Sequence, residues 1–223
     1  MLKNIENIDT IFWDWNGTIL NDAELCIDTM NLLLRKRQLP PLTYDKYRQI
    51  FTFPVRDYYQ KAGFDFSRED FSVPATEFIE IYNQKVPDTG IFENARVLLD
   101  FFKGKGFRQY IISAMKWKQL HASVSHQGLR DYFTDVLGIR DHFADGKAYL
   151  AAGLMKERKL LPGQVCIIGD TLHDHEIAQS INCECILVAG GHQSGERLRS
   201  SGRMLVNDII QLKEIFKNHD TDK

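Results

Sequence analysis

The sequence has no strong excess of charge of either sign. Its 28 lysine and arginine residues nearly balance 30 aspartate and glutamate residues, and the formal net charge at pH 7 is −2. A chain this close to neutrality has no overall field that would attract a nucleic-acid backbone or an anionic membrane. We therefore expect neither a nucleic acid nor a membrane surface as a partner.

Cysteines and long apolar runs are also scarce. The four cysteines are Cys26, Cys166, Cys183 and Cys185, and no two of them form a C-x-x-C pair. Such a set is too sparse for a secreted disulfide framework and lacks the spacing of a zinc or redox motif. Residues 1–9 do not resemble a secretory leader, and no apolar run approaches the ~20 residues that span a bilayer. These absences predict a cytoplasmic protein with reduced thiols, and they leave its oligomeric state open.

The chain does contain a regular alternation of short apolar runs with longer amphipathic stretches. The apolar runs, which we predict to be strands, lie at residues 8–14, 107–113, 134–139, 164–169, 183–189 and 204–206. Helix-length segments separate most of them; in one, at 92–105, Leu98 and Phe102 share a helical face and Gly106 follows as a stop. This alternation predicts an α/β fold with a Rossmann-like, doubly wound parallel sheet that helices cover on both faces.

The alternation is interrupted between residues 21 and 90, a stretch that reads as several helices without a convincing strand. Asn21 and Glu24 have the spacing of a capping box at the start of the first helix. Three further helices are expected to start near Thr43, Pro54 and Pro74. The stretch therefore predicts an inserted, all-helical unit.

This insertion divides the chain into two predicted domains. We assign residues 1–20 and 91–223 to a Rossmann-like catalytic core and residues 21–90 to an all-α cap. The cap holds eleven of the chain's 25 aromatic residues, more than its share by length. Because aromatic side chains at helical spacing usually pack against one another, we interpret most of them as the cap's own core.

Polar residues follow three of the predicted strands. Asp14 ends the first strand and Ser113 ends the second, while Asp170 and Asp174 follow the fourth. Ligands of doubly wound sheets bind at the carboxyl ends of the strands, so these side chains are expected to converge there. Carboxylate oxygens are the ligands that Mg²⁺ prefers, and a metal at such a site suggests a phosphate substrate. A carboxylate can attack phosphorus, and Lys147 can supply the positive charge that this attack needs.

These residues stand in the order and approximate spacing of the four motifs of the haloacid dehalogenase-like hydrolases. The motifs are Asp14 to Thr18, Ser113, Lys147, and Gly169 to Asp174, and the resemblance covers nearly the whole chain. The insertion between the first two motifs is similar to the cap of that superfamily's first subclass, and the C-terminal half is similar to phosphoglycolate phosphatases. The resemblance implies a Mg²⁺-dependent phosphatase that acts on a small phosphorylated metabolite through an aspartyl-phosphate.

The resemblance also implies a role for each motif residue. Asp14 is the expected nucleophile, Ser113 hydrogen-bonds the phosphoryl group, and Lys147 neutralises it. The expected Mg²⁺ ligands are the carboxylates of Asp14, Asp170 and Asp174 and the backbone carbonyl of Asn16. The expected catalytic residues are Asp14, Asn16, Ser113 and Lys147, and the expected substrate-binding residues are Thr18, Ser113, Ala114, Lys147 and, from a cap loop, Arg56.

One position departs from the family pattern. The family's phosphatases carry an acid two residues after the nucleophile, which protonates the leaving oxygen and then activates water, and this chain has Asn16 there. A carboxamide does not titrate near neutral pH, and losing such a catalyst costs about 10²- to 10⁴-fold in rate. Three hypotheses stay open: a slow phosphatase that prefers good leaving groups, a site that recruits another group such as His173, and a phosphate-binding relative without turnover. A metal-independent hydrolase of the dehalogenase type is a further alternative.

Several of the singled-out residues also have a purely structural interpretation. Asp174 could cap the helix that follows it, Lys116 competes for the role of the active-site cation, and Arg56 could be a solvated surface residue. His173 and His175 flank Asp174 but have no cysteine or histidine partner at zinc-binding spacing. We therefore expect neither histidine to bind zinc.

Overall fold

The computed structural model describes residues 5–140 and 146–217 of the chain. Its centre is a six-stranded sheet in which every neighbouring pair of strands is parallel, with the order β3-β2-β1-β4-β5-β6. The strands are β1 (Thr10–Trp13), β2 (Arg108–Lys116), β3 (Asp135–Ile139), β4 (Val165–Gly169), β5 (Glu184–Val188) and β6 (Met204–Val206). All six predicted strands are present, and the predicted fold class is confirmed.

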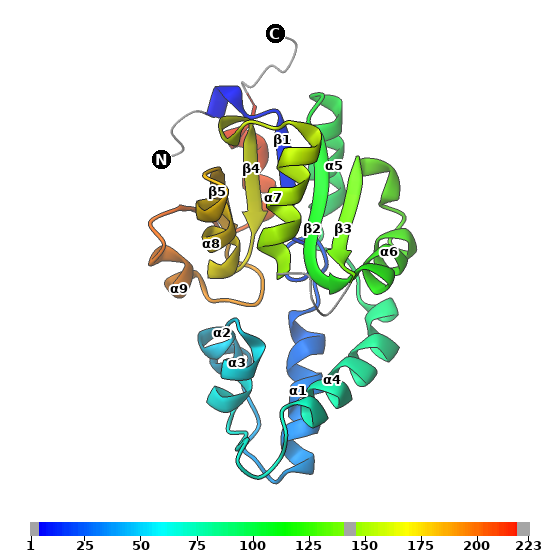
Figure 1. The fold of residues 1–223 in the computed structure, drawn as a ribbon, viewed down its shortest axis with the longest axis vertical. Coiled ribbons are helices and arrows are strands. Elements are labelled where there is room, and N and C mark those ends of the chain that lie inside the picture. Colours follow the sequence, from blue (N-terminus) through cyan, green and yellow to red (C-terminus); the bar gives the residue numbers. More distant parts are fainter. Residues whose placement is uncertain (1–4, 141–145, 218–223) are drawn as a thin grey trace.

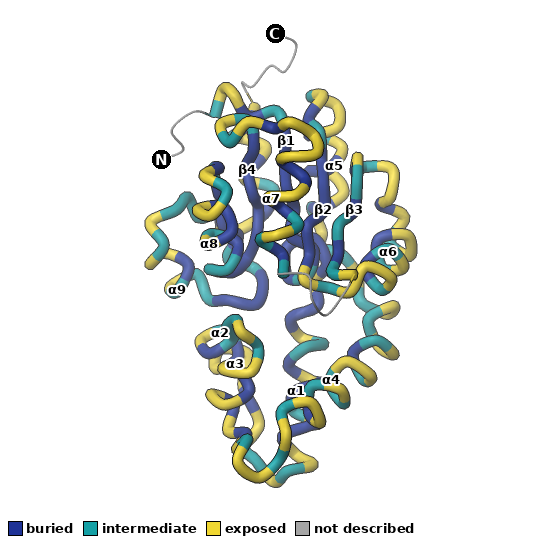
Figure 2. Tube along the Cα trace, in the orientation of Figure 1, coloured by how far each residue is buried: buried dark blue, intermediate teal, exposed yellow. Residues whose placement is uncertain are grey.

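The strands direct alternate side chains into two apolar layers. On β1, Ile11 and Trp13 face one layer and Phe12 faces the other. The first layer is covered by α5 (Ala95–Gly104), α6 (Trp117–His126) and α10 (Leu212–Ile215), and the second by α7 (Gly146–Arg158), α8 (Leu172–Ser180) and α9 (Gly195–Arg199). Figure 2 shows the strands buried between these helices. Burial on both faces explains why the strands appear in the sequence as continuous apolar runs.

Four helices form the inserted unit, which we call the cap; the sheet and its covering helices are the core. The cap helices are α1 (Ala23–Lys36), α2 (Tyr44–Ile50), α3 (Val55–Ala62) and α4 (Ser72–Lys85). Residues 21–90 are all described and contain no strand. The cap has its own apolar cluster, in which Met30 and Leu34 of α1 join Tyr47 and Tyr59. The cap lies beyond the carboxyl ends of the strands (Figure 1).

The chain crosses between core and cap twice, and the two crossings lie side by side. Leu20 and Ile91 form an isolated antiparallel bridge. The backbone N–H of Asn21 donates to the carbonyl of Gly90 at 3.0 Å. The two ends of the insertion are therefore hydrogen-bonded to each other.

The end of α2 makes a second contact between cap and core. The guanidinium of Arg48 donates to the carbonyl oxygens of Ala189 and Gln193, the latter at 3.1 Å. The side chain of Gln193 donates to the carbonyl of Phe51 at 3.0 Å, and the backbone N–H of Ser194 donates to the carbonyl of Arg48 at 3.2 Å. Hydrogen bonds thus connect the loop after β5 to the cap as well.

Most predicted helix boundaries agree with the structure. Thr43 caps α2 by accepting from the backbone N–H of Lys46 at 3.2 Å, Pro54 precedes α3, and Pro74 lies in the first turn of α4. Gly106, with φ of +78°, follows the end of α5 as expected. Short 3₁₀ helices lie at Ile5–Asn7, Val86–Asp88, Arg130–Tyr132, Pro162–Gln164 and Ile209–Gln211.

Two local predictions are wrong. Asn21 and Glu24 form no capping box, because α1 is preceded by Asp22, whose side chain has other partners. Ser113 does not end its strand, because β2 continues to Lys116 and pairs again with β3 after an irregularity in the register.

Among the described residues no helix is both long and apolar enough to cross a membrane. All four cysteines are free.

Candidate active site

Asp14 directly follows β1, at the carboxyl edge of a central strand. Its backbone N–H donates to the carbonyl of Ile168 at 2.9 Å, which extends the pairing of β1 with β4 by one residue. The chain then turns, since the N–H groups of Ile19 and Leu20 both donate to the carbonyl of Trp15. The Asp14 carboxylate is buried at this edge of the sheet, which faces the cap.

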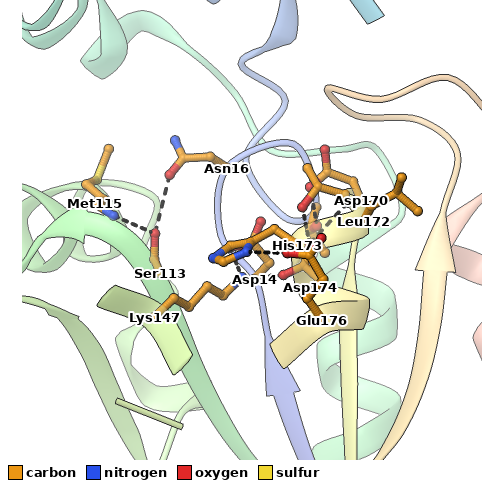
Figure 3. A network of polar contacts seen from close by, with 12 residues as sticks. Asp14, Asn16, Ser113, Met115, Lys147, Asp170, Leu172, His173, Asp174 and Glu176 are labelled. Atoms are coloured by element: carbon orange, nitrogen blue, oxygen red, sulfur yellow. Dashed lines mark hydrogen bonds and ion pairs between the residues drawn. The ribbon is translucent and has the colours of Figure 1, made fainter. Parts of the chain in front are cut away.

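Two further buried carboxylates lie beside Asp14. Asp170 follows β4, and Asp174 lies in the first turn of α8. One carboxylate oxygen from each of the three residues lies within 4.8 Å of the other two. The structure therefore brings together the three acids that the sequence predicted to converge (Figure 3).

Burial makes three neighbouring negative charges costly. It raises the pKa of Asp14 to about 8, with Lys147 opposing the rise and the other two carboxylates adding to it. It also raises the pKa of Asp170. Burial acts in the same direction on Asp174, but the ammonium of Lys147 and hydrogen bonds from Thr171 outweigh it, so the pKa of Asp174 lies below its usual value.

Lys147 is the cation that the chain itself supplies to this cluster. It lies at the start of α7 and is buried, and its Nζ donates to Oδ1 of Asp14 at 2.7 Å and to Oδ1 of Asp174. Although burial opposes the change, these two carboxylates raise the pKa of Lys147, so it stays charged at neutral pH. Lys116, the competing candidate, is an exposed residue at the pocket described below.

Asp174 is both a member of the cluster and a helix cap. Its Oδ2 accepts from the backbone N–H of Thr171 at 3.1 Å and from the hydroxyl of Thr171 at 2.8 Å, which completes a capping box on α8. A Cβ added at Gly169 would lie 2.1 Å from Cγ of Asp174. The expectation that Asp174 caps the N-terminus of α8 is therefore correct. This capping uses Oδ2 and leaves Oδ1 to contact Lys147.

Asp170 is fixed by hydrogen bonds and by a close fit against two glycines. The hydroxyl of Thr18 donates to its Oδ1 at 3.0 Å, and the backbone N–H of His192 donates to its Oδ2 at 2.6 Å. A Cβ added at Gly17 would lie 2.4 Å from that Oδ2, and a Cβ added at Gly191 would lie 2.1 Å from it. Gly17 also has a φ of +74°, which glycine adopts without strain. The sequence needs glycine at both positions for Asp170 to occupy its place.

The cluster fits a hard divalent cation. Its three donors are carboxylates, and Mg²⁺ prefers oxygen ligands. Two of the three have pKa values raised by burial and by negative neighbours, and a bound cation would stabilise their charged forms. Lys147 compensates only part of the charge of three carboxylates, which leaves the site room for further positive charge.

The side chain of Asn16 is held by residues at the start and end of the cap. Its Nδ2 donates to Oδ2 of Asp22 and to the hydroxyl of Tyr82, both at 2.8 Å. The Tyr82 hydroxyl in turn donates to the same oxygen of Asp22 at 2.7 Å. On its other side, Oδ1 of Asn16 accepts a long hydrogen bond, 3.5 Å, from the hydroxyl of Ser113. The position two residues after Asp14 thus carries a fixed amide.

The structure brings together only part of the predicted substrate-binding set. Ser113, Ala114 and Lys147 line one pocket. Thr18 is fully buried, and its hydroxyl is engaged by Asp170. Thr18 therefore supports an acid of the cluster and does not belong to the pocket lining formed by the described residues.

Of Arg56 and His173, only His173 lines the pocket. Arg56 is exposed, and its guanidinium lies 5.3 Å from the ring centroid of Phe66 on the cap. It is therefore not brought to the pocket lining that the described residues form. His173 does line the pocket, with Nδ1 3.2 Å from a carboxylate oxygen of Glu176. Neither His173 nor His175 belongs to a group of potential metal ligands among the described residues.

His192 is a site residue that the sequence reasoning missed. It is buried between core and cap, with Nδ1 2.7 Å from the hydroxyl of Tyr47 and Nε2 3.3 Å from Oδ1 of Asp22. Although burial opposes the change, Asp22 and Asp170 are among the acids that raise the pKa of His192 to about 9. The available signal was a histidine that follows a glycine pair in the loop after a predicted strand.

Asp22 was missed as well, and it connects the same elements. Besides its contacts with Asn16 and Tyr82, it accepts from the backbone N–H of Gly17 at 2.9 Å. Burial alone would raise its pKa, but His192 and these hydrogen bonds outweigh burial and lower the pKa of Asp22. Its carboxylate is therefore used by the active-site turn, which explains why it does not cap α1.

A pocket of about 420 Å³ lies over these residues. At the core end its lining includes Asp14, Asn16, Ser113 and Lys147. At the cap end the lining is largely aromatic and consists mainly of Tyr47, Phe51, Phe53, Tyr58, Tyr59, Phe71, Phe78 and Tyr82. Several of these rings do pack in the cap's own cluster, as predicted, but the same rings also form a wall of the pocket. The interpretation of the cap aromatics as packing alone was therefore incomplete.

Comparison with known proteins identifies the family. A sequence profile of the haloacid dehalogenase-like hydrolases matches residues 11–188. The chain belongs to this family. The matched residues of this haloacid dehalogenase-like hydrolase include Asp14, Lys147 and Asp174 together with the whole cap. His192 lies outside the matched range.

Relatives of known name align with most of the hydrolase. A phosphoglycolate phosphatase of Chromobacterium violaceum is 23% identical over 225 residues, which is 96% of this chain and 99% of the relative. A phosphoglycolate phosphatase of Rhodobacter capsulatus is 24% identical over 187 residues, 82% of this chain and 85% of the relative. The alignment with the first relative spans both the core and the cap.

Solved structures share the fold. A haloacid dehalogenase-like family hydrolase from Streptococcus pneumoniae superposes with a TM-score of 0.83 at 17% identity, covering 94% of this chain and 99% of that one. A predicted phosphoglycolate phosphatase from Haemophilus somnus gives a TM-score of 0.74 at 17% identity, covering 94% and 98%. At such low identity, these superpositions establish the shared fold of core and cap.

Proposed function

We propose that this hydrolase is a Mg²⁺-dependent phosphatase of a small phosphate monoester, with Asp14 as the nucleophile. The observation that carries the proposal is the buried cluster at the core end of the pocket. There, oxygens of three carboxylates lie within 4.8 Å of one another, and the ammonium of Lys147 lies 2.7 Å from Asp14. The relatives named phosphoglycolate phosphatases support phosphate chemistry at this cluster.

Residues of the cluster would hold the metal. We assign Mg²⁺ to the carboxylates of Asp14, Asp170 and Asp174, with the backbone carbonyl of Asn16 as a further ligand. When bound, the ion would supply positive charge that attracts the phosphoryl group and stabilises the charge that develops in the transition state.

Asp14 performs the first chemical step in this proposal. One of its oxygens forms a bond to phosphorus while the bond from phosphorus to the ester oxygen breaks, and the electron pair leaves with that oxygen. Lys147 and Ser113, at the same end of the pocket, hold the anionic phosphoryl oxygens. Water then attacks phosphorus in the aspartyl-phosphate, which releases inorganic phosphate and regenerates the Asp14 carboxylate.

Asn16 limits this reaction. Its amide, fixed by Asp22 and Tyr82, can hydrogen-bond the leaving oxygen but cannot give it a proton. We therefore propose a phosphatase that is slow with esters of poor leaving groups. We also propose that residues 1–20 and 91–223 carry out catalysis, while residues 21–90 exclude water and select the substrate.

Hydrolysis of p-nitrophenyl phosphate tests the proposal. We expect turnover with Mg²⁺, its loss with a chelator, and a decrease of roughly 10⁴-fold in Asp14→Asn. The matched control is Asp131→Asn, which changes an exposed aspartate outside the pocket and should keep the wild-type rate.

Other outcomes would replace the proposal. Hydrolysis of a haloacid that is unaffected by chelation would indicate the dehalogenase type of reaction. Binding of phosphate without turnover of the activated ester would indicate a non-catalytic relative.

A further inference from the structure

The pocket over Asp14 is chemically divided between its two ends. The core end carries the charged and hydrogen-bonding groups, whereas the cap end is built from rings of α2, α3 and α4 and the segments around them. The rings are in mutual contact: Phe51 and Tyr58 have centroids 5.3 Å apart, and Tyr59 and Phe71 have centroids 5.4 Å apart, both in edge-to-face geometry. A substrate that places its phosphate against Asp14 therefore extends its leaving group among aromatic rings.

The part of the pocket wall that α2, α3 and α4 form offers no cation to a charged leaving group. The described lining residues contributed by α2, α3 and α4 include no lysine, arginine or histidine. Arg56 of α3 stacks on Phe66 instead of lining the pocket, and Asp22 adds a negative charge near Asn16. The cationic side chains of the lining come from the core, where Lys147 is paired with Asp14 and Asp174 and His192 with Asp22. A carboxylate that lies among the cap rings would lose its water without gaining a partner there, which is costly. The pocket therefore favours an uncharged leaving group.

Asn16 points independently to the same kind of substrate. Asn16 cannot protonate the leaving oxygen, so the intrinsic stability of that oxygen as an anion has a larger influence on the rate. A phenol ionises with a pKa of about 10, as in the side chain of tyrosine. The hydroxyl of an aliphatic alcohol is a much weaker acid, closer to water. A site with an amide at position 16 is therefore better suited to a phenolic oxygen than to an aliphatic one.

We propose that the substrate is the phosphate monoester of an aromatic alcohol, with an uncharged ring system that enters the cap end of the pocket. This inference rests on the proposed phosphatase function and narrows its substrate class. The bond between Asp14 and phosphorus forms, the bond between phosphorus and the aryl oxygen breaks, and the phenolate leaves with the electron pair and takes a proton from water. Ring stacking and leaving-group stability then favour the same compounds.

Four phosphate compounds separate the contribution of the aromatic ring from that of leaving-group stability. Phenyl phosphate has an aromatic group and a stable leaving anion, and benzyl phosphate has the aromatic group with a poor leaving oxygen. Acetyl phosphate has a stable leaving anion without a ring, and phosphoglycolate has neither feature and carries a carboxylate. We expect phenyl phosphate to have the highest kcat/KM, and benzyl phosphate to exceed phosphoglycolate by at least about tenfold, because a shaped apolar pocket discriminates by roughly that factor.

A substitution in the pocket wall tests the charge argument. Ile79 lines the pocket from α4 and is partly exposed, so Ile79→Lys places a cation at the cap end without burying it completely. We expect Ile79→Lys to lower the KM for phosphoglycolate and to raise the KM for benzyl phosphate, each by several-fold. Val97→Lys is the matched control, because Val97 is a similarly exposed apolar residue of α5 that does not line the pocket.

Binding of phosphonates distinguishes failure of this inference from failure of the phosphatase proposal. With Mg²⁺ present, calorimetry should show benzylphosphonate binding at least about tenfold more tightly than phosphonoacetate. Equal binding, or tighter binding of phosphonoacetate, would overturn the aromatic substrate class even if p-nitrophenyl phosphate is hydrolysed. Tighter binding of benzylphosphonate without turnover of any of the four esters would keep the pocket's selectivity and overturn the phosphatase proposal.

Discussion

The core and the cap line opposite ends of one pocket with chemically different side chains. The core end has Asp14 and Lys147 in its lining, and the carboxylates of Asp170 and Asp174 lie beside Asp14 at the carboxyl edge of the sheet. The cap end has aromatic rings on helices that do not belong to the sheet. The difference separates two tasks: bond breaking depends on charges held by the core, and recognition of the leaving group depends on the shape and polarity of the cap.

The two regions are nevertheless connected through buried polar residues. Asp22, at the first crossing into the cap, contacts the active-site turn, the amide of Asn16 and the ring of His192. His192 also contacts Tyr47 of α2. The ion pair of Asp22 with His192 and the hydrogen bonds of both residues therefore join the cap to the core end of the pocket. Substitutions in the core and in this connection both test how the two regions differ.

Removing the cation of the core should have the largest effect. Lys147→Met leaves Asp14 and Asp174 without their buried positive partner and removes a group that stabilises the phosphoryl charge. We expect kcat for p-nitrophenyl phosphate to fall by about 10³-fold. Lys118→Met, a change at an exposed lysine of α6, should leave kcat unchanged. A loss smaller than tenfold in Lys147→Met would show that the metal ligands act without this lysine.

Restoring an acid at position 16 should have the next largest effect. In Asn16→Asp the new carboxyl faces the carboxylate of Asp22, and two adjacent acids raise the pKa of one of them. We expect the rate with benzyl phosphate to rise by about 10²-fold, with a smaller gain for phenyl phosphate, whose leaving group needs no acid. Asn83→Asp adds the same charge elsewhere on the pocket wall and should give no gain. Equal gains for the two esters would contradict the role assigned to position 16.

Cutting the connection between core and cap should reduce stability. His192→Gln leaves the buried carboxylate of Asp22 without a charged partner, and we expect a loss of about 3 kcal/mol in the free energy of unfolding. Urea denaturation measures this loss, and His126→Gln at an exposed position of α6 is the control. Faster hydrogen exchange in α2 should accompany it, since Tyr47 loses its partner. If the two variants are equally stable, the core and cap are not coupled through this pair.

A comparison of two adjacent glycines gives the smallest expected effect. In Gly191→Ala the new Cβ would lie 2.1 Å from an oxygen of Asp170, so the carboxylate must move. In Gly190→Ala the nearest atom is an edge carbon of the Phe92 ring at 3.4 Å. We expect Mg²⁺ affinity, measured by calorimetry, to fall about tenfold in Gly191→Ala only. A similar decrease in both variants would mean that the loop, not the position of Asp170, controls the metal.

The core was the more predictable region. Its strands are short apolar runs because they are buried on both faces, and the carboxyl-edge rule then located Asp14, Asp170 and Asp174 without knowledge of the register. The register is consistent with this rule: Trp13 pairs with Ile168, so Asp14 emerges beside Gly169 and Asp170 follows one residue later. The predicted end of a strand was wrong where the strand continues beyond its apolar run. This happens in β2, which extends to Lys116 because that residue pairs with β3.

The cap was predictable in its helices but not in its surfaces. Thr43, Pro54 and Pro74 marked helix starts, because capping and backbone restriction are local properties. Which aromatic rings would face the active site was not a local property. Arg56 illustrates this limit. We expected it in a cap loop that faces the substrate, whereas it lies in α3 and its guanidinium packs on Phe66.

The amino-acid sequence by itself determined the α/β fold class, the inserted helices, the acids at the strand ends and the amide at position 16. These follow from periodicity, turn chemistry and residue identity, which act over a few neighbouring positions. Only the tertiary structure decided the roles of Asp22 and His192 and the aromatic character of the pocket. Their partners are remote in the chain, with a sequence separation of 60 between Asp22 and Tyr82 and of 145 between Tyr47 and His192, so packing alone brings them together.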